Sequence, residues 1–222
     1  MSILITAGPT YERIDPVRFI GNYSSGKMGI ALAEECVNRE IDVILVLGPV
    51  NITSHIFNNP HIKIINVESA KQMYDACMQF YPHCEGAILC AAVADFTPIS
   101  VADHKIKREG DELIIRLKPT NDIAASLGNI KKENQLLAGF ALETDDEETN
   151  AKGKMQRKNF DFIVLNSLND EGAGFRHDTN KITIIDKYKE YEYPLKTKKE
   201  CAKDIIDKYC EMLKTSGKPV DK

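Results

Sequence analysis

The chain has 222 residues, enough for one domain with its own hydrophobic core. Apolar residues make up 43% and charged residues 28%, values that exclude fibrous and disordered classes. The longest apolar run, residues 87–94, is far shorter than the ~18 residues that span a bilayer, so no membrane partner is expected. No basic stretch precedes the first apolar residues, so a secretory signal is not expected either.

Charge and cysteine content narrow the function classes further. The net charge of −4 argues against a general nucleic-acid binder, which usually carries a basic surface. Six cysteines without a Cys-x-x-Cys pair or a signal peptide indicate reduced thiols in a cytoplasmic protein. The five histidines do not stand at metal-ligand spacing, so a zinc site is not expected.

Short apolar runs alternate with helical patterns along the chain. In chain order we predict a strand at 3–7, a helix at 26–39, strands at 42–47 and 63–67, a helix at 69–81, strands at 86–94, 113–117 and 136–142, a helix at 144–158, a strand at 161–166, a hairpin at 181–186 and 191–193, and a helix at 197–213. Helix starts are marked by capping-box pairs: Ser69 with Gln72, Thr144 with Glu147, and Thr197 with Glu200.

This alternation predicts the architecture. We expect an α/β fold of three layers, with a mostly parallel, Rossmann-like sheet and helices on both faces. The alternating residues at 113–117 indicate a half-exposed antiparallel strand outside that sheet. A single domain is expected at 1–214, followed by a polar tail at 215–222.

The loop after the first predicted strand is the first candidate site. Residues 8–29 have the sequence GPTYERIDPVRFIGNYSSGKMG, in which a helix starts at a turn of small residues. Free N–H groups at a helix N-terminus bind anions, so we expect an anion site; helix capping with close packing is the alternative. A P-loop is not expected, because Met28 stands where a magnesium-binding hydroxyl is required. Asn22 offers a donor and an acceptor, and Arg18 suits phosphate.

Two further segments carry groups suited to a nucleotide. Asp95 follows a strand that ends in small residues. There its carboxylate either accepts hydrogen bonds from ribose or base groups of a nucleotide, or it caps a turn. Residues 105–108, Lys-Ile-Lys-Arg, place three cations in a loop of an otherwise acidic chain. Such a loop suits a mobile flap over phosphates, or alternatively a solvated edge.

Two more segments lie later in the chain. Lys154 and Lys158 are four residues apart and share one helix face, where they meet one phosphate chain or merely complement the helix dipole. Residues 119–123 form a polar turn that opens a short helix, either as a simple cap or as another phosphate or base contact.

Taken together, these segments resemble the phosphopantothenate–cysteine ligase family. The matching stretches, in family order, are ITAGPTYERIDPVRFIGNYSSGKMG, AAVADF, KIKR, AGFALET, KMQRKNFD, IVLN and GFRHDTN. They cover nearly the whole chain. In many bacteria this ligase follows a flavin-dependent decarboxylase domain, whereas here Met1 lies a few residues before the first strand. We therefore expect a stand-alone bacterial-type ligase with no flavin.

The resemblance implies a two-step reaction in coenzyme A synthesis. The carboxylate of 4′-phosphopantothenate attacks the α-phosphate of a nucleoside triphosphate, and the amine of L-cysteine then displaces the nucleoside monophosphate from the acyl-nucleotidylate. It implies Mg²⁺ with the nucleotide, and CTP rather than ATP because KIKR and AAVADF resemble bacterial members. It also implies a homodimer that shares its active sites, with the antiparallel extension or the late hairpin at the contact, and a separate decarboxylase protein acting next.

The resemblance assigns roles to individual residues. It implies that Asn22 holds the acyl-nucleotidylate and that Arg18 binds the phosphate of phosphopantothenate. Lys105, on the flap, is expected to be catalytic, with Lys107 as a substrate-binding neighbour. The residues expected to bind the nucleotide are Gly8, Ala92, Asp95, Lys105, Asn121, Asp122, Ile123, Ala124, Phe140, Lys154 and Lys158. Asn121 replaces a proline that is usual in the family.

Two other functions stay open at this point. A nicotinamide-dependent reductase is disfavoured, because only Gly26 and Gly29 remain of the G-x-G-x-x-G fingerprint and no acidic residue ends the strand at 42–47. A non-catalytic nucleotide sensor is disfavoured because it has no need for an asparagine and a flap lysine at one site.

Overall fold

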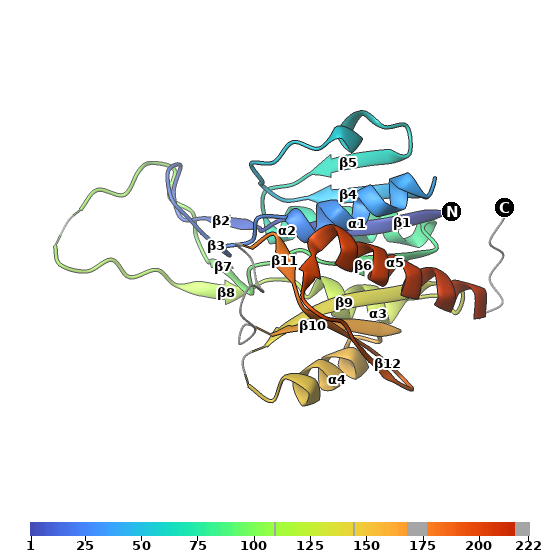
Figure 1. Ribbon diagram of the computed structural model, residues 1–222. Coiled ribbons are helices and arrows are strands. Elements are labelled where there is room, and N and C mark those ends of the chain that lie inside the picture. Colours follow the sequence, from blue (N-terminus) through green and yellow to red (C-terminus); the bar gives the residue numbers. More distant parts are fainter. Residues whose placement is uncertain (109, 144, 168–176, 216–222) are drawn as a thin grey trace.

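The computed structural model describes residues 1–108, 110–143, 145–167 and 177–215. These residues form an α/β domain in which an eight-stranded sheet lies between two layers of helices (Figure 1). The predicted three-layer, Rossmann-like class is confirmed.

The order of the strands fixes where a ligand can bind. From one edge to the other they are β13 (Glu190–Glu192), β12 (Ile182–Asp186), β10 (Phe162–Ser167), β9 (Leu136–Glu143), β6 (Gly86–Leu89), β1 (Ser2–Ala7), β4 (Asp42–Leu47) and β5 (Ile62–Asn66). The strands from β10 to β5 run parallel, and β12 and β13 are antiparallel. Chain order reverses between β1 and β6, and ligands bind outside the carboxyl ends of parallel strands at such a reversal.

Five α-helices of the described chain cover the sheet. They are α1 (Lys27–Asn38), α2 (Ala70–Phe80), α3 (Ile123–Ile130), α4 (Glu147–Arg157) and α5 (Lys198–Thr215), with short 3-10 helices at His55–Asn58 and Tyr81–His83. α1 and α5 pack side by side on one face, while α2, α3 and α4 cover the other (Figure 1). None of these described helices combines the length and apolar character that crossing a membrane requires.

The close approach of α1 to β1 depends on Gly29. A Cβ at Gly29 would lie 2.4 Å from the Cβ of Ala7, whose backbone belongs to the central strand. We expect Gly29→Ala to lower the free energy of unfolding by about 1–3 kcal/mol, because α1 must move away from the sheet. For a chain of this size that is a fall in Tm of roughly 2–4 °C per kcal/mol, measurable by calorimetry.

Gly153→Ala is the matched control for this prediction. Gly153 lies within α4, where a Cβ would meet only the flexible end of Arg157. Removing a glycine from a helix interior should raise stability by up to about 1 kcal/mol. If Gly29→Ala melted like Gly153→Ala, the close contact between α1 and β1 would not limit packing.

Short strands outside the main sheet build an arm. β7 (Phe96–Pro98) pairs with β8 (Leu117–Pro119), and the chain between them projects far from the body; we call residues 96–119 the arm (Figure 1). The hairpin of β2 (Tyr11–Arg13) and β3 (Phe19–Gly21) contacts the base of the arm. A further pair, β11 (Thr179–Asn180) with β14 (Lys196–Thr197), lies before α5.

Asp15 ties the β2–β3 hairpin to the arm. Its buried carboxylate accepts hydrogen bonds from the backbone N–H of Val17 (2.8 Å) and Ile106 (3.1 Å). The guanidinium of Arg18 also donates to it through Nε at 3.0 Å, and to the carbonyl oxygen of Ile106 at 2.9 Å. The Arg18 hydrogen bond, followed by the backbone N–H groups, holds the pKa of Asp15 well below its usual range.

We expect the arm to loosen at acidic pH through Asp15. Because its pKa is lower in the folded chain, its contribution to stability is complete above the unfolded value of about 3.9 and is lost as the pH falls below that value. Asp15→Asn should speed hydrogen exchange at the Ile106 amide already at neutral pH. Asp103→Asn, an exposed change on the same arm, is the control and should leave that exchange unchanged.

The structure corrects several predicted elements. The strand expected at 86–94 ends at Leu89, and the strand expected at 113–117 is absent except for its last residue. α4 starts at Glu147 with Asp146 at its N-cap and no side-chain cap, so the Thr144 cap is not its start; Thr144 itself lies outside the described residues, as does the tail from residue 216. The β2–β3 hairpin was not predicted.

Candidate active site

Two cavities open side by side at the carboxyl ends of the parallel strands, where chain order reverses. The larger has a volume of about 400 Å³ and the smaller about 320 Å³. Val93, Asp95, Phe140 and Lys154 line both, so the two cavities adjoin. The site therefore lies where strand order places ligands in this type of sheet.

The wall between them is the chain just after β6, which threonine hydroxyls hold in place. The Oγ1 of Thr6 accepts from the backbone N–H of Cys90 (3.1 Å) and Ala91 (3.2 Å). The Oγ1 of Thr10 accepts from the N–H of Ala94 at 2.9 Å. These side-chain bonds add to backbone bonds from Cys90 N–H to the Thr6 carbonyl (3.3 Å) and from Ala92 N–H to the Gly8 carbonyl (2.9 Å), so the chain stays beside β1 after regular β structure ends at Leu89.

Asn22 is fixed at the edge of the larger cavity. Its Nδ2 donates to the carbonyl oxygens of Ala92 (3.1 Å) and Val93 (3.2 Å). All three residues line this cavity, so the structure brings the predicted Asn22 and Ala92 together. These two hydrogen bonds set the orientation of the amide before any ligand binds.

The N-terminus of α1 opens into the same cavity. Gly26 is its N-cap, in the left-handed region with φ of 77°, and no side chain caps the helix. A Cβ at Gly26 would lie 2.6 Å from Cγ1 of Val50, so both conformation and space require glycine. The first N–H groups and the positive end of the helix dipole therefore face a cavity in which an anion could be bound.

The smaller cavity collects the predicted nucleotide residues. Those that line it are Asp95, Asn121, Asp122, Ile123, Ala124, Phe140, Lys154 and Lys158. Asp122 caps α3 by accepting from the N–H of Ala125 at 2.9 Å and also pairs with Lys158. Lys154 donates to the carbonyl oxygen of Phe140 at 2.8 Å. The shared helix face of Lys154 and Lys158 therefore faces one site.

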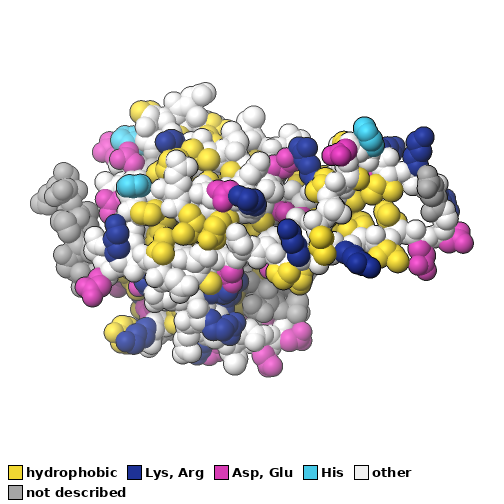
Figure 2. Space-filling view, turned by 180° about the vertical axis from the view of Figure 1, so that it is seen from behind, with side chains coloured by type: hydrophobic (Ala, Val, Ile, Leu, Met, Phe, Trp, Pro, Cys, Tyr) yellow, Lys and Arg dark blue, Asp and Glu magenta, His cyan; other side chains and the backbone are white. Residues whose placement is uncertain are grey.

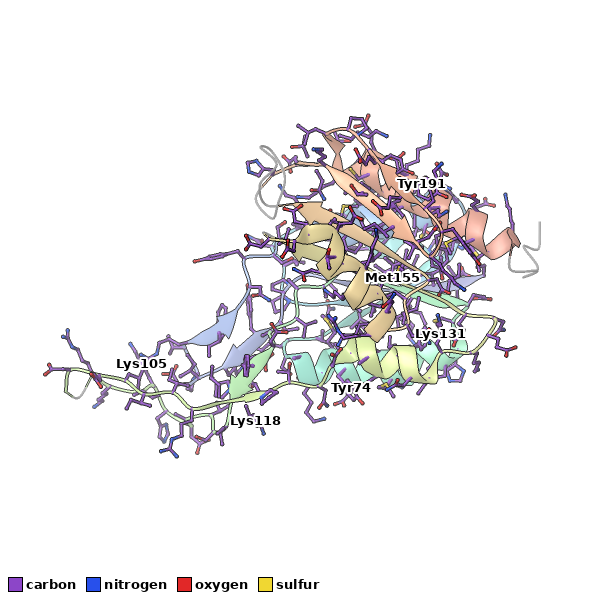
Figure 3. All side chains as sticks on the ribbon, turned by 90° about the horizontal axis from the view of Figure 1, so that it is seen from below. Tyr74, Lys105, Lys118, Lys131, Met155 and Tyr191 are labelled. Atoms are coloured by element: carbon purple, nitrogen blue, oxygen red, sulfur yellow. The ribbon has the colours of Figure 1, made fainter. Side chains whose placement is uncertain are left out.

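Four of the predicted site residues line neither cavity of this chain. Gly8 adopts a φ of 82° beside Val50 and lines neither cavity. The guanidinium of Arg18 is bound to Asp15 at the base of the arm. Lys105 and Lys107 are exposed on the arm, away from both cavities (Figure 3). The expected flap does not cover the site in this conformation.

Three residues at the far end of the larger cavity were not predicted as site residues. They are Asn166, near the end of β10, Asn180, at the end of β11, and Lys198, the first residue of α5. The two asparagines fall in the IVLN and GFRHDTN stretches, whose resemblance was the available signal. No motif in the sequence marked Lys198 as a site residue.

The thiols of the chain are chemically quiet. All six cysteines are free, and Cys90 lines the larger cavity. Burial raises the pKa of the Cys90 and Cys77 thiols to about 12 and that of Cys201 to about 11. These groups therefore stay protonated at neutral pH and do not act as nucleophiles.

Comparison with known proteins gives the family. The model of the DNA/pantothenate metabolism flavoprotein C-terminal domain matches residues 1–213. The chain belongs to this family. A crystal structure of the C-terminal domain of the coenzyme A biosynthesis bifunctional protein CoaBC has a TM-score of 0.80 at 42% identity and covers 96% of each chain. The DNA/pantothenate metabolism flavoprotein from Streptococcus pneumoniae, at 23% identity and a TM-score of 0.82, has the same fold over 96% of this chain and 99% of its own.

Full-length relatives carry two different names. The CoaBC protein of Bacillus subtilis is 44% identical over 97% of this chain and 52% of its own length. A protein named cysteine/cysteine sulfinic acid decarboxylase, from an unknown prokaryotic organism, is 58% identical over 93% of this chain and 57% of its own length. The chain thus spans just over half of each of these relatives.

Proposed function

We propose that this chain joins 4′-phosphopantothenate to L-cysteine, with CTP preferred over ATP as the activating nucleotide. The observation that supports this most directly is the convergence of Asn22, Asp95 and Lys154 with the open N-terminus of α1 at two adjoining cavities. A nucleotide and an acid substrate need such a pair of adjoining sites, one of which must accept phosphate. Membership of the family and the likeness to CoaBC add support.

In the first proposed step a carboxylate oxygen of phosphopantothenate attacks the α-phosphorus. The bond from that phosphorus to the bridging oxygen breaks, pyrophosphate leaves, and an acyl-nucleotidylate remains. Negative charge grows on phosphate oxygens, so donors fixed in advance are the groups that lower the barrier. The N–H groups of α1 and the ammonium groups of Lys154 and Lys158 are such donors.

In the second proposed step the neutral amine of cysteine attacks the acyl carbon. The carbon–oxygen bond to the phosphate breaks, nucleoside monophosphate leaves, and the nitrogen loses its extra proton to solvent as the amide forms. The role of Asn22 is to hold the acyl group between the two steps, in the orientation that its bonds to Ala92 and Val93 impose.

Magnesium enters this proposal only as a companion of the nucleotide. In the described parts of the chain no three His, Cys, Asp or Glu side chains gather where they could hold a metal ion. Mg²⁺ readily binds through phosphates and water with few protein ligands, so the triphosphate itself is its expected holder. When bound, it would neutralise phosphate charge.

Pyrophosphate release tests the function. Purified protein is mixed with magnesium and each nucleotide, with and without phosphopantothenate and cysteine. We expect release that requires phosphopantothenate and is faster with CTP than with ATP. Release that ignores phosphopantothenate would contradict the ligase, and binding of nucleotide without any turnover would favour a sensor.

The same samples test whether this chain has the decarboxylase activity that the name of one relative suggests. Cysteine alone, without nucleotide, should give no carbon dioxide if this chain acts as the proposed ligase. Titration with NADH or NADPH, followed by absorbance, should show no binding and so distinguishes a reductase.

A second copy of the chain is part of the proposal. Exposed large apolar side chains gather on the arm and the adjoining hairpin: Val17, Phe19, Phe96, Ile99, Val101, Leu113, Ile114 and Leu117. Figure 2 shows hydrophobic side chains along the arm, which stands clear of the body. Apolar surface of this kind usually marks an interface. We propose a symmetric dimer in which the arm of one copy brings Lys105 to the cavities of the other.

A further inference from the structure

Two asparagines and a lysine line one end of the larger cavity. Asn166 pairs in register with Leu142 of β9 on one side and with Ile182 of β12 on the other. One residue, Lys181, separates Asn180 from the start of β12, and Lys198 begins α5. Three elements of the fold, β10, β11 and α5, thus bring these side chains to one cavity.

The amide oxygens of both asparagines have no hydrogen-bond partner among the described residues. Within the described part of the chain, neither Asn166 Oδ1 nor Asn180 Oδ1 accepts a hydrogen bond, although both atoms are buried. Asn180 is only 2% exposed. Buried polar atoms are nearly always satisfied, so two such atoms on residues that line one cavity indicate a ligand that donates hydrogen bonds.

Lys198 adds a cation to the same end. It is 8% exposed, its Nζ donates to the carbonyl oxygen of His177, and its charge acts on the nearby Cys90 thiol. Burial, and then the charge of Lys27, lowers the pKa of Lys198. A buried cation at a cavity wall is a natural partner for a carboxylate on the ligand.

We propose that the α-amino acid substrate binds here, with its amine on the oxygens of Asn166 and Asn180 and its carboxylate on Lys198. This assignment rests on the proposed function and specifies where its second substrate lies. Cys90 and Met28 give the same cavity apolar wall, which suits a short side chain such as that of cysteine.

Other ligands fit the same end less well. Phosphate oxygens would face the amide oxygens of both asparagines, which cannot donate to them. A divalent cation would lie next to the Lys198 ammonium and be repelled by it. An amine gains from that neighbour, because a nearby positive charge lowers the pKa of the amine and favours the neutral form that attacks the acyl carbon.

The test separates the two half-reactions. Pyrophosphate release in a single turnover without any amine reports the first, and steady-state turnover with cysteine or with cysteamine, which lacks the carboxylate, reports both. We expect Lys198→Met to leave the first half-reaction within about twofold of wild type. Its KM for cysteine should rise at least tenfold, and the wild-type preference for cysteine over cysteamine should fall at least tenfold.

Two more variants complete the design. Lys199→Met is the matched control, because Lys199 is exposed and pairs with Glu34 outside the cavity; it should behave as wild type. Asn180→Leu, of similar shape, should slow amine transfer at least tenfold while sparing pyrophosphate release. Thermal melting checks that each variant is folded.

Each outcome has a distinct meaning. If Lys198→Met and Asn180→Leu slowed pyrophosphate release as much as amine transfer, this end would belong to the nucleotide and the inference would be overturned. An unchanged preference for cysteine over cysteamine in folded Lys198→Met would overturn it too. A wild-type protein without phosphopantothenate-dependent pyrophosphate release would refute the proposed function, and the inference with it.

Discussion

Replacing Asn22 by alanine should lower turnover of the complete reaction by about 100-fold or more. Misplacement of a reacting group by about 1 Å can cost about 10²-fold in rate. Asn22 can position the acyl group in this way, because its hydrogen bonds to the backbone carbonyls of Ala92 and Val93 fix the amide against the cavity wall. We expect kcat to carry most of the loss, with the KM for the nucleotide within about threefold of wild type.

Asn129→Ala is the control for this measurement. Asn129 is exposed in the last turn of α3, whereas the first turn of that helix lines the smaller cavity. Its removal should leave turnover and melting temperature close to wild type. Unchanged turnover in Asn22→Ala would show that the amide does not act on the reacting acyl group.

Lys105→Gln should reduce turnover by more than about tenfold, and mixing should reveal where Lys105 acts. One donor directed at phosphate is often worth a few kcal/mol. Lys105 lies on the arm, far from the cavities of its own chain (Figure 3). If arms cross between copies, an Asn22→Ala chain and a Lys105→Gln chain together form one dimer site with both residues intact.

The mixing experiment has a numerical expectation. Random reassortment of equal amounts makes about half of the dimers mixed, each with one intact site, so activity should recover to about a quarter of wild type. The turnover of each variant measured alone gives the baseline. If the arm instead folds over its own cavity, or if sedimentation shows a monomer, mixing should give no recovery.

Much of the fold follows from local pattern. The strand at 42–47 is apolar on both faces because helices cover both, and the structure has it at those residues. The capping boxes of Ser69 with Gln72 and Thr197 with Glu200 are present, because they depend only on neighbouring residues.

The incorrect predictions depend on distant contacts. In the apolar run after Leu89, hydroxyls of Thr6 and Thr10, more than 80 residues away in sequence, accept hydrogen bonds from the amides of Cys90, Ala91 and Ala94. The alternating pattern at 113–117 has the character of a strand, but in the described residues it is a regular strand only at Leu117, with one more backbone hydrogen bond from Ile99 N–H to the Arg116 carbonyl.

The sequence predicted those site residues that lie close after the ends of parallel strands. Asn22, Asp95 and Lys154 meet as expected, because parallel strands bring their following loops to one edge. Lys198 was out of reach, since it enters the cavity only through the path of the chain into α5. No local pattern encodes that path.

The protonated thiols have a consequence for an enzyme proposed to handle free cysteine. Exchange between a thiol and a disulfide needs a thiolate, and Cys90, with a pKa of about 12, supplies almost none at neutral pH. Cystine or oxidised glutathione therefore has no ready point of attack within the cavity. Cys90 is therefore expected to remain an unmodified part of the cavity wall while the redox state of the cysteine pool fluctuates.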